Sequence, residues 1–134
     1  MPNLIWTELV TLVALLMYFM MGLGVGRARV KYKIAAPAIS GDPVFERHLR
    51  VHLNTLEWLP IFLTSLWLFA LQAGDRVAAG IGAVWIVGRI IYWMTYVRNP
   101  GSRGAGFGIQ ALAALTLLIG TLVGVVQQLL AGAV

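Results

Sequence analysis

Four long runs of apolar residues occupy most of this 134-residue chain and leave little room for a soluble domain. The runs extend over about residues 6–25, 45–73, 77–97 and 106–130. Each is long enough to cross the ~30 Å hydrocarbon layer of a membrane, which takes roughly 20 helical residues. Hydrophobic residues make up 60% of the chain and charged residues only 11%, less than in an ordinary soluble domain. The chain is therefore predicted to be an integral membrane protein with one domain, residues 1–134.

The pattern within the runs decides between the two structures that can span lipid, which are α-helices and closed β-barrels. No run alternates polar and apolar residues with a period of two, so the predicted fold class is an all-α bundle of four transmembrane helices. Gly22, Gly24 and Gly26 are expected to end the first helix. Pro43 suits the first turn of the second helix, and Ser102 suits the N-cap of the fourth.

Basic residues gather at two of the three connections between the predicted helices. They are Arg27, Arg29, Lys31, Lys33, Arg47, Arg50, Arg98 and Arg103. The connection between helices two and three has only Arg76, beside Asp75. The positive-inside rule then places both basic connections in the cytoplasm and both termini on the opposite side. Basic groups at membrane ends argue against a nucleic-acid partner and leave anionic lipid headgroups as an alternative partner for Arg27 to Lys33.

A stripe of polar residues leads into the second helix. At about 100° per residue, the residues of this stripe fall within a sector of roughly 100°. They are Glu46, Arg47, Arg50, Asn54 and Glu57. Because charge at the edge of a bilayer is costly and commonly functional, the stripe is predicted to face a small charged ligand.

A second stripe lies on the third helix, where Trp85, Arg89, Tyr92 and Tyr96 share a sector of roughly 60°. Arg89 is predicted to lie roughly 12 Å inside the membrane, where an unpaired arginine would cost several kcal/mol. Glu57 is the expected partner. This stripe therefore indicates either a structural ion pair between two helices or one wall of a polar pocket.

These two stripes resemble the signature of a known membrane family. The second helix reads Glu46-Arg47-x-x-Arg50-x-His52-x-Asn54-x-x-Glu57-x-x-Pro60, and the third adds Tyr92 and Tyr96, with Arg103 seven residues further on. The pattern is similar to that of the membrane-associated proteins in eicosanoid and glutathione metabolism. That group includes microsomal glutathione transferases, leukotriene and prostaglandin E synthases, and a non-catalytic lipoxygenase-activating protein.

The resemblance implies a homotrimer that binds glutathione at each subunit interface, near the cytoplasmic face. It implies that Arg50 and Asn54 hold one carboxylate of glutathione, that Arg29 contacts the other, and that Glu57 holds the amino group. His52, Tyr92 and Tyr96 complete the implied binding residues. Arg103 would lie at the sulfur as the catalytic residue. His52 stands where the leukotriene synthases have glutamine and the transferase and prostaglandin branches have histidine, and Trp58 replaces a tyrosine of the leukotriene branch. Because His52 projects roughly opposite the Arg50 stripe, a contact between helices is an alternative interpretation of this residue.

The predicted activity is a glutathione transferase or peroxidase acting on a lipophilic electrophile or a lipid hydroperoxide that arrives through the bilayer. The chain has no cysteine, so a protein thiol cannot be the nucleophile or a metal ligand, and no metal site is predicted. A non-catalytic lipid-binding scaffold of the same fold and a small transporter are the alternatives. Gly120 and Gly124 on the fourth helix are interpreted as packing within one bundle or as a dimerisation motif.

Overall fold

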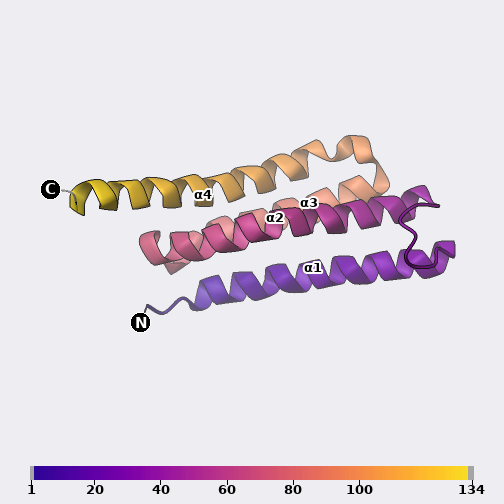
Figure 1. Cartoon of the computed structure of the whole chain (residues 1–134), viewed down its shortest axis with the longest axis horizontal. Coiled ribbons are helices and arrows are strands. Elements are labelled where there is room, and N and C mark those ends of the chain that lie inside the picture. Colours follow the sequence, from indigo (N-terminus) through magenta and orange to yellow (C-terminus); the bar gives the residue numbers. More distant parts are fainter. Residues whose placement is uncertain (1, 133–134) are drawn as a thin grey trace.

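Four long helices run alternately up and down in the computed structural model, which describes residues 2–132 (Figure 1). They are α1 (Ile5–Tyr32), α2 (Pro43–Ala73), α3 (Asp75–Arg98) and α4 (Gly104–Gly132). A short 3-10 helix, η1 (Pro100–Ser102), precedes α4. All four long helices have the length and composition needed to cross a membrane. The predicted all-α membrane fold is confirmed, and the chain is an integral, multi-pass membrane protein.

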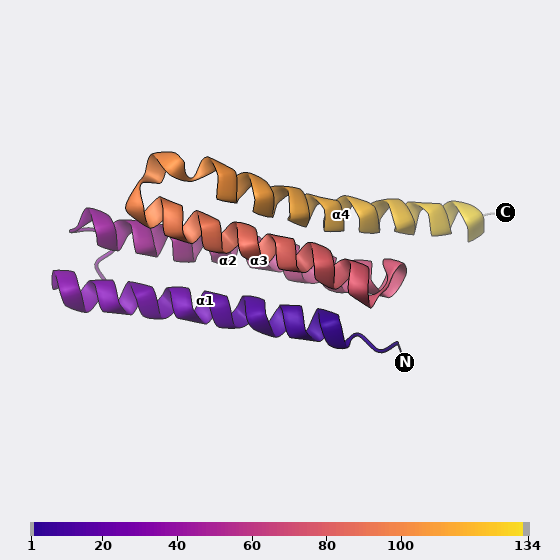
Figure 2. The same cartoon turned by 180° about the vertical axis from the view of Figure 1, so that it is seen from behind.

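The connections place the functional residues at one end of the bundle. The α1–α2 loop and η1 lie together at the end that carries most of the basic residues, here called the basic end (Figure 1). Both termini lie toward the other end. Seen from either side, α2 and α3 overlap and separate α1 from α4 (Figure 2). Any site built from α2, α3 and the start of α4 must therefore lie away from α1.

The end of α1 differs from the prediction, because the helix passes through Gly22, Gly24 and Gly26 and stops only at Tyr32. Lys33 adopts a left-handed conformation with φ of 57°, and the Ile34 N–H donates to the Arg29 carbonyl at 2.9 Å. In lipid, backbone N–H and C=O groups without hydrogen bonds cost more free energy than a glycine inside a helix. The first two glycines instead make room for histidines of α2, since an added Cβ would lie 3.3 Å from His52 Nε2 or 3.4 Å from His48 Nδ1.

The helix starts are fixed by carboxylates. Asp42 is the N-cap of α2 and accepts from Val44 N–H at 2.8 Å, with Pro43 in the first turn as predicted. Asp75 begins α3, and its carboxylate also caps α1 by accepting from the backbone N–H groups of Trp6 and Thr7. A negative group beside a helix N-terminus satisfies free N–H donors and opposes the positive end of the helix dipole.

Ser102 does not cap α4, and this prediction was wrong. It ends η1, whose first turn is held by the Asn99 side chain, which accepts from Gly101 N–H at 3.0 Å. The 3-10 turn includes Ser102, so α4 starts at Gly104, one residue later than an N-cap at Ser102 would give.

The outside of the bundle is apolar along all four helices, as a lipid-facing surface requires. Large side chains such as Leu12, Phe19, Leu112 and Leu129 are exposed. The interior holds a stacked pair, Phe62 on Trp85, with ring centroids 3.9 Å apart.

Candidate functional site

A pocket of about 260 Å³ opens at the basic end between α2, α3 and the start of α4. Its walls are Arg50, Asn54, Tyr92, Arg103, Gly104 and Phe107. The sequence analysis named the first four of these as site residues, and the structure brings them together. Two arginines therefore face one small volume that has an aromatic wall and a backbone wall at the N-terminus of α4.

Close packing of α3 on α4 gives the pocket its shape. A Cβ on Gly106 would lie 2.7 Å from Tyr92 Cα, and one on Gly88 would lie 2.6 Å from the backbone nitrogen of Gln110. Both distances are too short for a real side chain, so only glycine allows the two backbones to approach this closely. The contact brings the first turn of α4, and Arg103 just before it, against Tyr92.

A chain of polar contacts connects the buried core to the pocket. Arg89 is fully buried on α3, and its Nη1 donates to Asn54 Oδ1 at 3.0 Å. Asn54 Nδ2 in turn donates to Glu57 Oε2 at 3.2 Å, and Glu57 lies 3.7 Å from Arg50. Because a guanidinium carries only donors, the Asn54 atom that faces Arg89 must be its oxygen. The Asn54 amide is therefore oriented with its N–H₂ group toward the Glu57 side.

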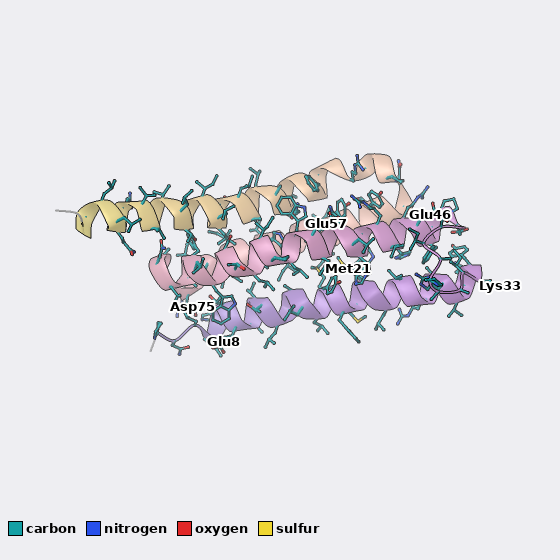
Figure 3. All side chains as sticks on the ribbon, in the orientation of Figure 1. Glu8, Met21, Lys33, Glu46, Glu57 and Asp75 are labelled. Carbon is teal, nitrogen blue, oxygen red and sulfur yellow. The ribbon has the colours of Figure 1, made fainter. Side chains whose placement is uncertain are left out.

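The predicted ion pair between Arg89 and Glu57 is wrong. Arg89 donates instead to neutral groups, Asn54 Oδ1 and Thr55 Oγ1, while its Nε has no hydrogen-bond partner among the described residues. Its guanidinium carbon lies 4.5 Å from the Tyr92 ring centroid. Glu57 lies on the edge of α2 (Figure 3), more than half exposed, and pairs with Arg50. Burying a full ion pair would remove two charges from water, whereas this arrangement buries one and leaves the carboxylate accessible.

The two charges that begin the α2 stripe have structural partners. Arg47 Nη1 donates to the carbonyls of Val97 and Arg98, each at 3.2 Å, and so closes the C-terminus of α3. Glu46 Oε1 accepts from the Gly41 N–H at 3.2 Å and holds the loop before α2. Of the predicted stripe, Arg50 and Asn54 therefore line the pocket, and Glu57 lies beside Arg50.

The chain is similar in sequence to known proteins of one membrane family. The sequence model of the MAPEG family matches residues 7–123. The chain belongs to the MAPEG family. It is 41% identical to human microsomal glutathione S-transferase 2 over 98 residues, which cover 72% of this chain and 67% of that protein. Guinea pig (Cavia porcellus) leukotriene C4 synthase is 32% identical over 124 residues, 92% of this chain and 83% of that protein. An uncharacterized protein of Synechocystis sp. is 43% identical over 127 residues, 95% of this chain and 93% of that protein.

Two residues of the MAPEG-like motif lie away from the pocket of their own chain. Arg29, at the end of α1, donates to the Ala38 carbonyl at 2.7 Å and lies over the Phe45 ring. His52 points to the α1 side of α2 and stacks on Tyr18, with ring centroids 4.4 Å apart. Since α2 and α3 separate α1 from α4, neither side chain lies among the residues that line the pocket.

Tyr96 is a neighbour of the pocket rather than a wall of it, because its ring lies 5.4 Å from that of Tyr92. Sequence reasoning did not identify Phe107, which lines the pocket and meets Trp58 edge-on at 5.7 Å. A possible signal for Phe107 was its position four residues after Arg103, on the same face of the helix. Thr55 was not predicted either, because its contact with Arg89 depends on how α2 and α3 pack against each other.

Proposed function

We propose that this MAPEG protein is a membrane-bound glutathione transferase or peroxidase. The convergence of Arg50, Asn54, Tyr92 and Arg103 on one pocket, with Glu57 beside it, is the observation that carries the proposal. The names of two relatives, a glutathione S-transferase and a leukotriene C4 synthase, support the same class of reaction.

The charges around the pocket complement those of glutathione, which has two carboxylates, one ammonium and one thiol. The forked guanidinium of Arg50 matches a carboxylate, to which Asn54 Nδ2 can also donate. Glu57 suits the ammonium. The loose 3.7 Å contact between Arg50 and Glu57 can be exchanged for ligand contacts at little cost, since both side chains are more than half exposed.

Arg103 is the residue that we assign to the sulfur. The thiolate is the reactive form, and a free thiol has a pKa of about 8.5. Lowering that pKa by two units takes roughly 2.7 kcal/mol, and one arginine at ~4 Å can supply this at an effective dielectric constant near 20. The N-terminus of α4 at Gly104 adds its free N–H groups on the same wall, which also favours an anion.

The reaction then follows from the thiolate. In a transfer, its sulfur forms a bond to an electrophilic carbon while the leaving group departs with the electron pair. In a reduction, two glutathione molecules supply two electrons and two protons, and the hydroperoxide becomes an alcohol and water while glutathione disulfide forms. Lipophilic substrates would reach the sulfur through the bilayer, past the aromatic side of Phe107.

We also propose a homotrimer in which Arg29 and His52 complete the glutathione site of a neighbouring subunit. Their location outside the pocket of their own chain supports this arrangement. The same proposal places the basic end in the cytoplasm, following the positive-inside rule, with both termini on the other side.

Calorimetric titration of the detergent-purified protein with glutathione tests the proposal. The wild-type protein should bind with micromolar to millimolar affinity, and Arg50→Ala should weaken binding about tenfold because it removes a charge-assisted contact. Arg76→Ala, which removes a charge beside Asp75 at the opposite end, is the matched control and should bind like wild type. The purified protein should also conjugate a chlorinated dinitrobenzene.

Failure of the wild-type protein to bind glutathione would overturn the proposal and favour the lipid-binding scaffold. If glutathione binds but the protein neither conjugates the aryl halide nor reduces a lipid hydroperoxide, glutathione would remain the proposed ligand and the proposed enzymatic activity would be wrong.

A further inference from the structure

A second cavity, of about 280 Å³, opens at the basic end on the other side of the bundle, between α1, α2 and α3. It shares no residue with the Arg50–Arg103 pocket. Its lining includes Gly24, Arg27 and Lys31 of α1, His48 of α2 and Trp93 of α3. Arg27 and Lys31 lie within about one and a half turns of the end of α1, near the depth of the lipid headgroups.

The cations of this cavity have no carboxylate partner. Arg27 and Lys31 are one helical turn apart on the same face of α1, and both side chains are exposed. The chain has five acidic residues, and all lie elsewhere. Asp42 and Asp75 cap helices, Glu46 holds the loop before α2, Glu57 pairs with Arg50, and Glu8 lies in the first turn of α1 at the far end. Two positive charges are therefore left to an external anion.

The rest of the cavity wall is partly polar and closely packed. His48 Nδ1 is buried and has no hydrogen-bond partner among the described residues. A Cβ on Gly24 would lie 3.4 Å from this nitrogen and 3.6 Å from Trp93, so the cavity keeps its depth because this position is glycine. The Lys31 ammonium lies 5.4 Å from the Tyr32 ring centroid, which holds it at the cavity edge.

An apolar groove continues from the charged cavity. It is formed by Gly22, Leu23, Gly26 and Val30 together with Arg27 and Lys31, and it has a volume of about 480 Å³. Gly22 lies further from the helix end than Arg27, so the groove runs from the basic groups toward the middle of the membrane. A ligand that fits both parts has an anionic head and an apolar tail.

We propose that Arg27 and Lys31 bind the phosphate of an anionic phospholipid, with one acyl chain in the groove along α1. Arg27 and Arg29 point about 160° apart around the helix axis, at 100° per residue. The two basic groups therefore face away from Arg29, the α1 residue assigned to glutathione, whereas Gly22 and Gly26 of the groove lie within about 60° of it on the same count. Arg27 and Lys31 do not line the Arg50–Arg103 pocket, so their binding of a lipid phosphate can be tested apart from the enzymatic activity. A free phosphate would meet the same charges but would leave the groove unfilled.

Native mass spectrometry of the full-length protein with added lipids tests this assignment. The probes are dioleoylphosphatidylglycerol, dioleoylphosphatidylcholine and, as soluble competitors, glycerol phosphate and inorganic phosphate. The wild-type protein should retain phosphatidylglycerol in preference to phosphatidylcholine. The double variant Arg27→Gln/Lys31→Gln should lose this retention by roughly 25-fold, since each basic group near an anionic headgroup contributes about fivefold.

The matched control is Lys33→Gln/Arg76→Gln, which removes the same number of charges at positions outside the cavity. Retention in the control should change far less than in the test variant. Equal loss in the two double variants, or equal retention of the two lipids by the wild-type protein, would overturn the site. Displacement of the lipid by inorganic phosphate at millimolar concentration would also overturn it, because the groove would then contribute nothing.

Discussion

Arg89 is buried as expected, but its partners are not the predicted ones, and it shapes the site without lining the pocket. It takes the oxygen of Asn54 and so leaves only the N–H₂ group of that amide for a ligand. Its stacking against Tyr92 also fixes a second wall of the pocket. A buried charge held by neutral groups is not an efficient way to stabilise a bundle, so we infer that Arg89 acts mainly by positioning Asn54.

Replacing Arg89 with methionine separates these two effects. We expect Arg89→Met to fold with an unchanged or higher midpoint of thermal unfolding, since an apolar side chain of similar length suits this buried site. Glutathione affinity should fall about tenfold, because Asn54 would be free to rotate. Calorimetry and thermal unfolding of the same preparation give both values. An unchanged affinity would show that Asn54 does not need Arg89.

Arg103 differs from Arg89 because it is assigned to direct contact with the substrate sulfur. Without it, the pKa of the bound thiol should return toward about 8.5, and the thiolate fraction at pH 7 should fall roughly 25-fold. Because the lowered pKa favours the thiolate, the Arg103→Ala rate should recover as the pH rises, whereas the wild-type rate should level off at lower pH. The pH profile of conjugation and the ultraviolet absorption of the bound thiolate check this. A variant that keeps the wild-type profile would remove Arg103 from thiol activation.

At the scale of helices, glycines decide where α3 and α4 meet. Gly106 lies against the backbone of Tyr92, while a Cβ at Gly108 would meet nothing within 4 Å. We expect Gly106→Ala to push the start of α4 outward, to cost about 1–3 kcal/mol of stability and to abolish glutathione binding. Gly108→Ala should be neutral or slightly stabilising, because alanine favours helix. Similar behaviour of the two variants in thermal unfolding and binding would contradict the close-approach explanation.

Helix ends also depend on contacts that are distant in sequence. Asp75 of α3 accepts from Trp6 N–H at 3.1 Å, and from Thr7 N–H and Thr7 Oγ1 at 2.8 Å. Asp75→Ala should therefore lower the midpoint of thermal unfolding by several degrees, because the N-terminus of α1 would keep only the bond from Ile5 N–H to the Asn3 side chain, and Leu4 at the N-cap offers no side-chain acceptor. Glu8→Gln, in the first turn of α1, is the matched control and should shift it far less. Glutathione binding at the other end should persist in both variants.

The surroundings of Gly120 and Gly124 decide between packing within one bundle and a dimerisation motif on α4. Gly120 faces Phe69, and Gly124 faces Gln72, both on α2 of the same chain. The pair of glycines therefore serves packing within one bundle.

At the scale of the whole molecule, the division of the site between subunits is the main prediction. If Arg29 completes the pocket of a neighbour, trimers mixed from Arg29→Ala and Arg103→Ala subunits should recover activity. In a one-to-one mixture about a quarter of the sites should combine an intact Arg103 with an intact neighbouring Arg29. Each variant alone should be inactive. Conjugation assays on co-expressed and separately expressed subunits check this, and no recovery in the mixture would place both residues in one subunit.

The sequence by itself determined the class of fold and indicated four residues that line the pocket, Arg50, Asn54, Tyr92 and Arg103. The apolar runs are long enough to span a membrane and show no alternation with a period of two, which leaves helices as the spanning structure. Lipid offers no hydrogen-bond partner to backbone groups that are not paired within the protein. The helical angle of 100° per residue placed Arg50, Asn54 and Glu57 on one face and Arg89 with Tyr92 on another.

Tertiary structure decided how these faces meet. It gave Arg89 neutral partners in place of Glu57, assigned Arg47 to the end of α3, and turned Arg29 and His52 away from the pocket. It also carried α1 through Gly22, Gly24 and Gly26, and histidines of α2 fill the space beside the first two. The reason is that a helical repeat fixes which side chains share a face, whereas the partner of that face depends on how closely two backbones can approach.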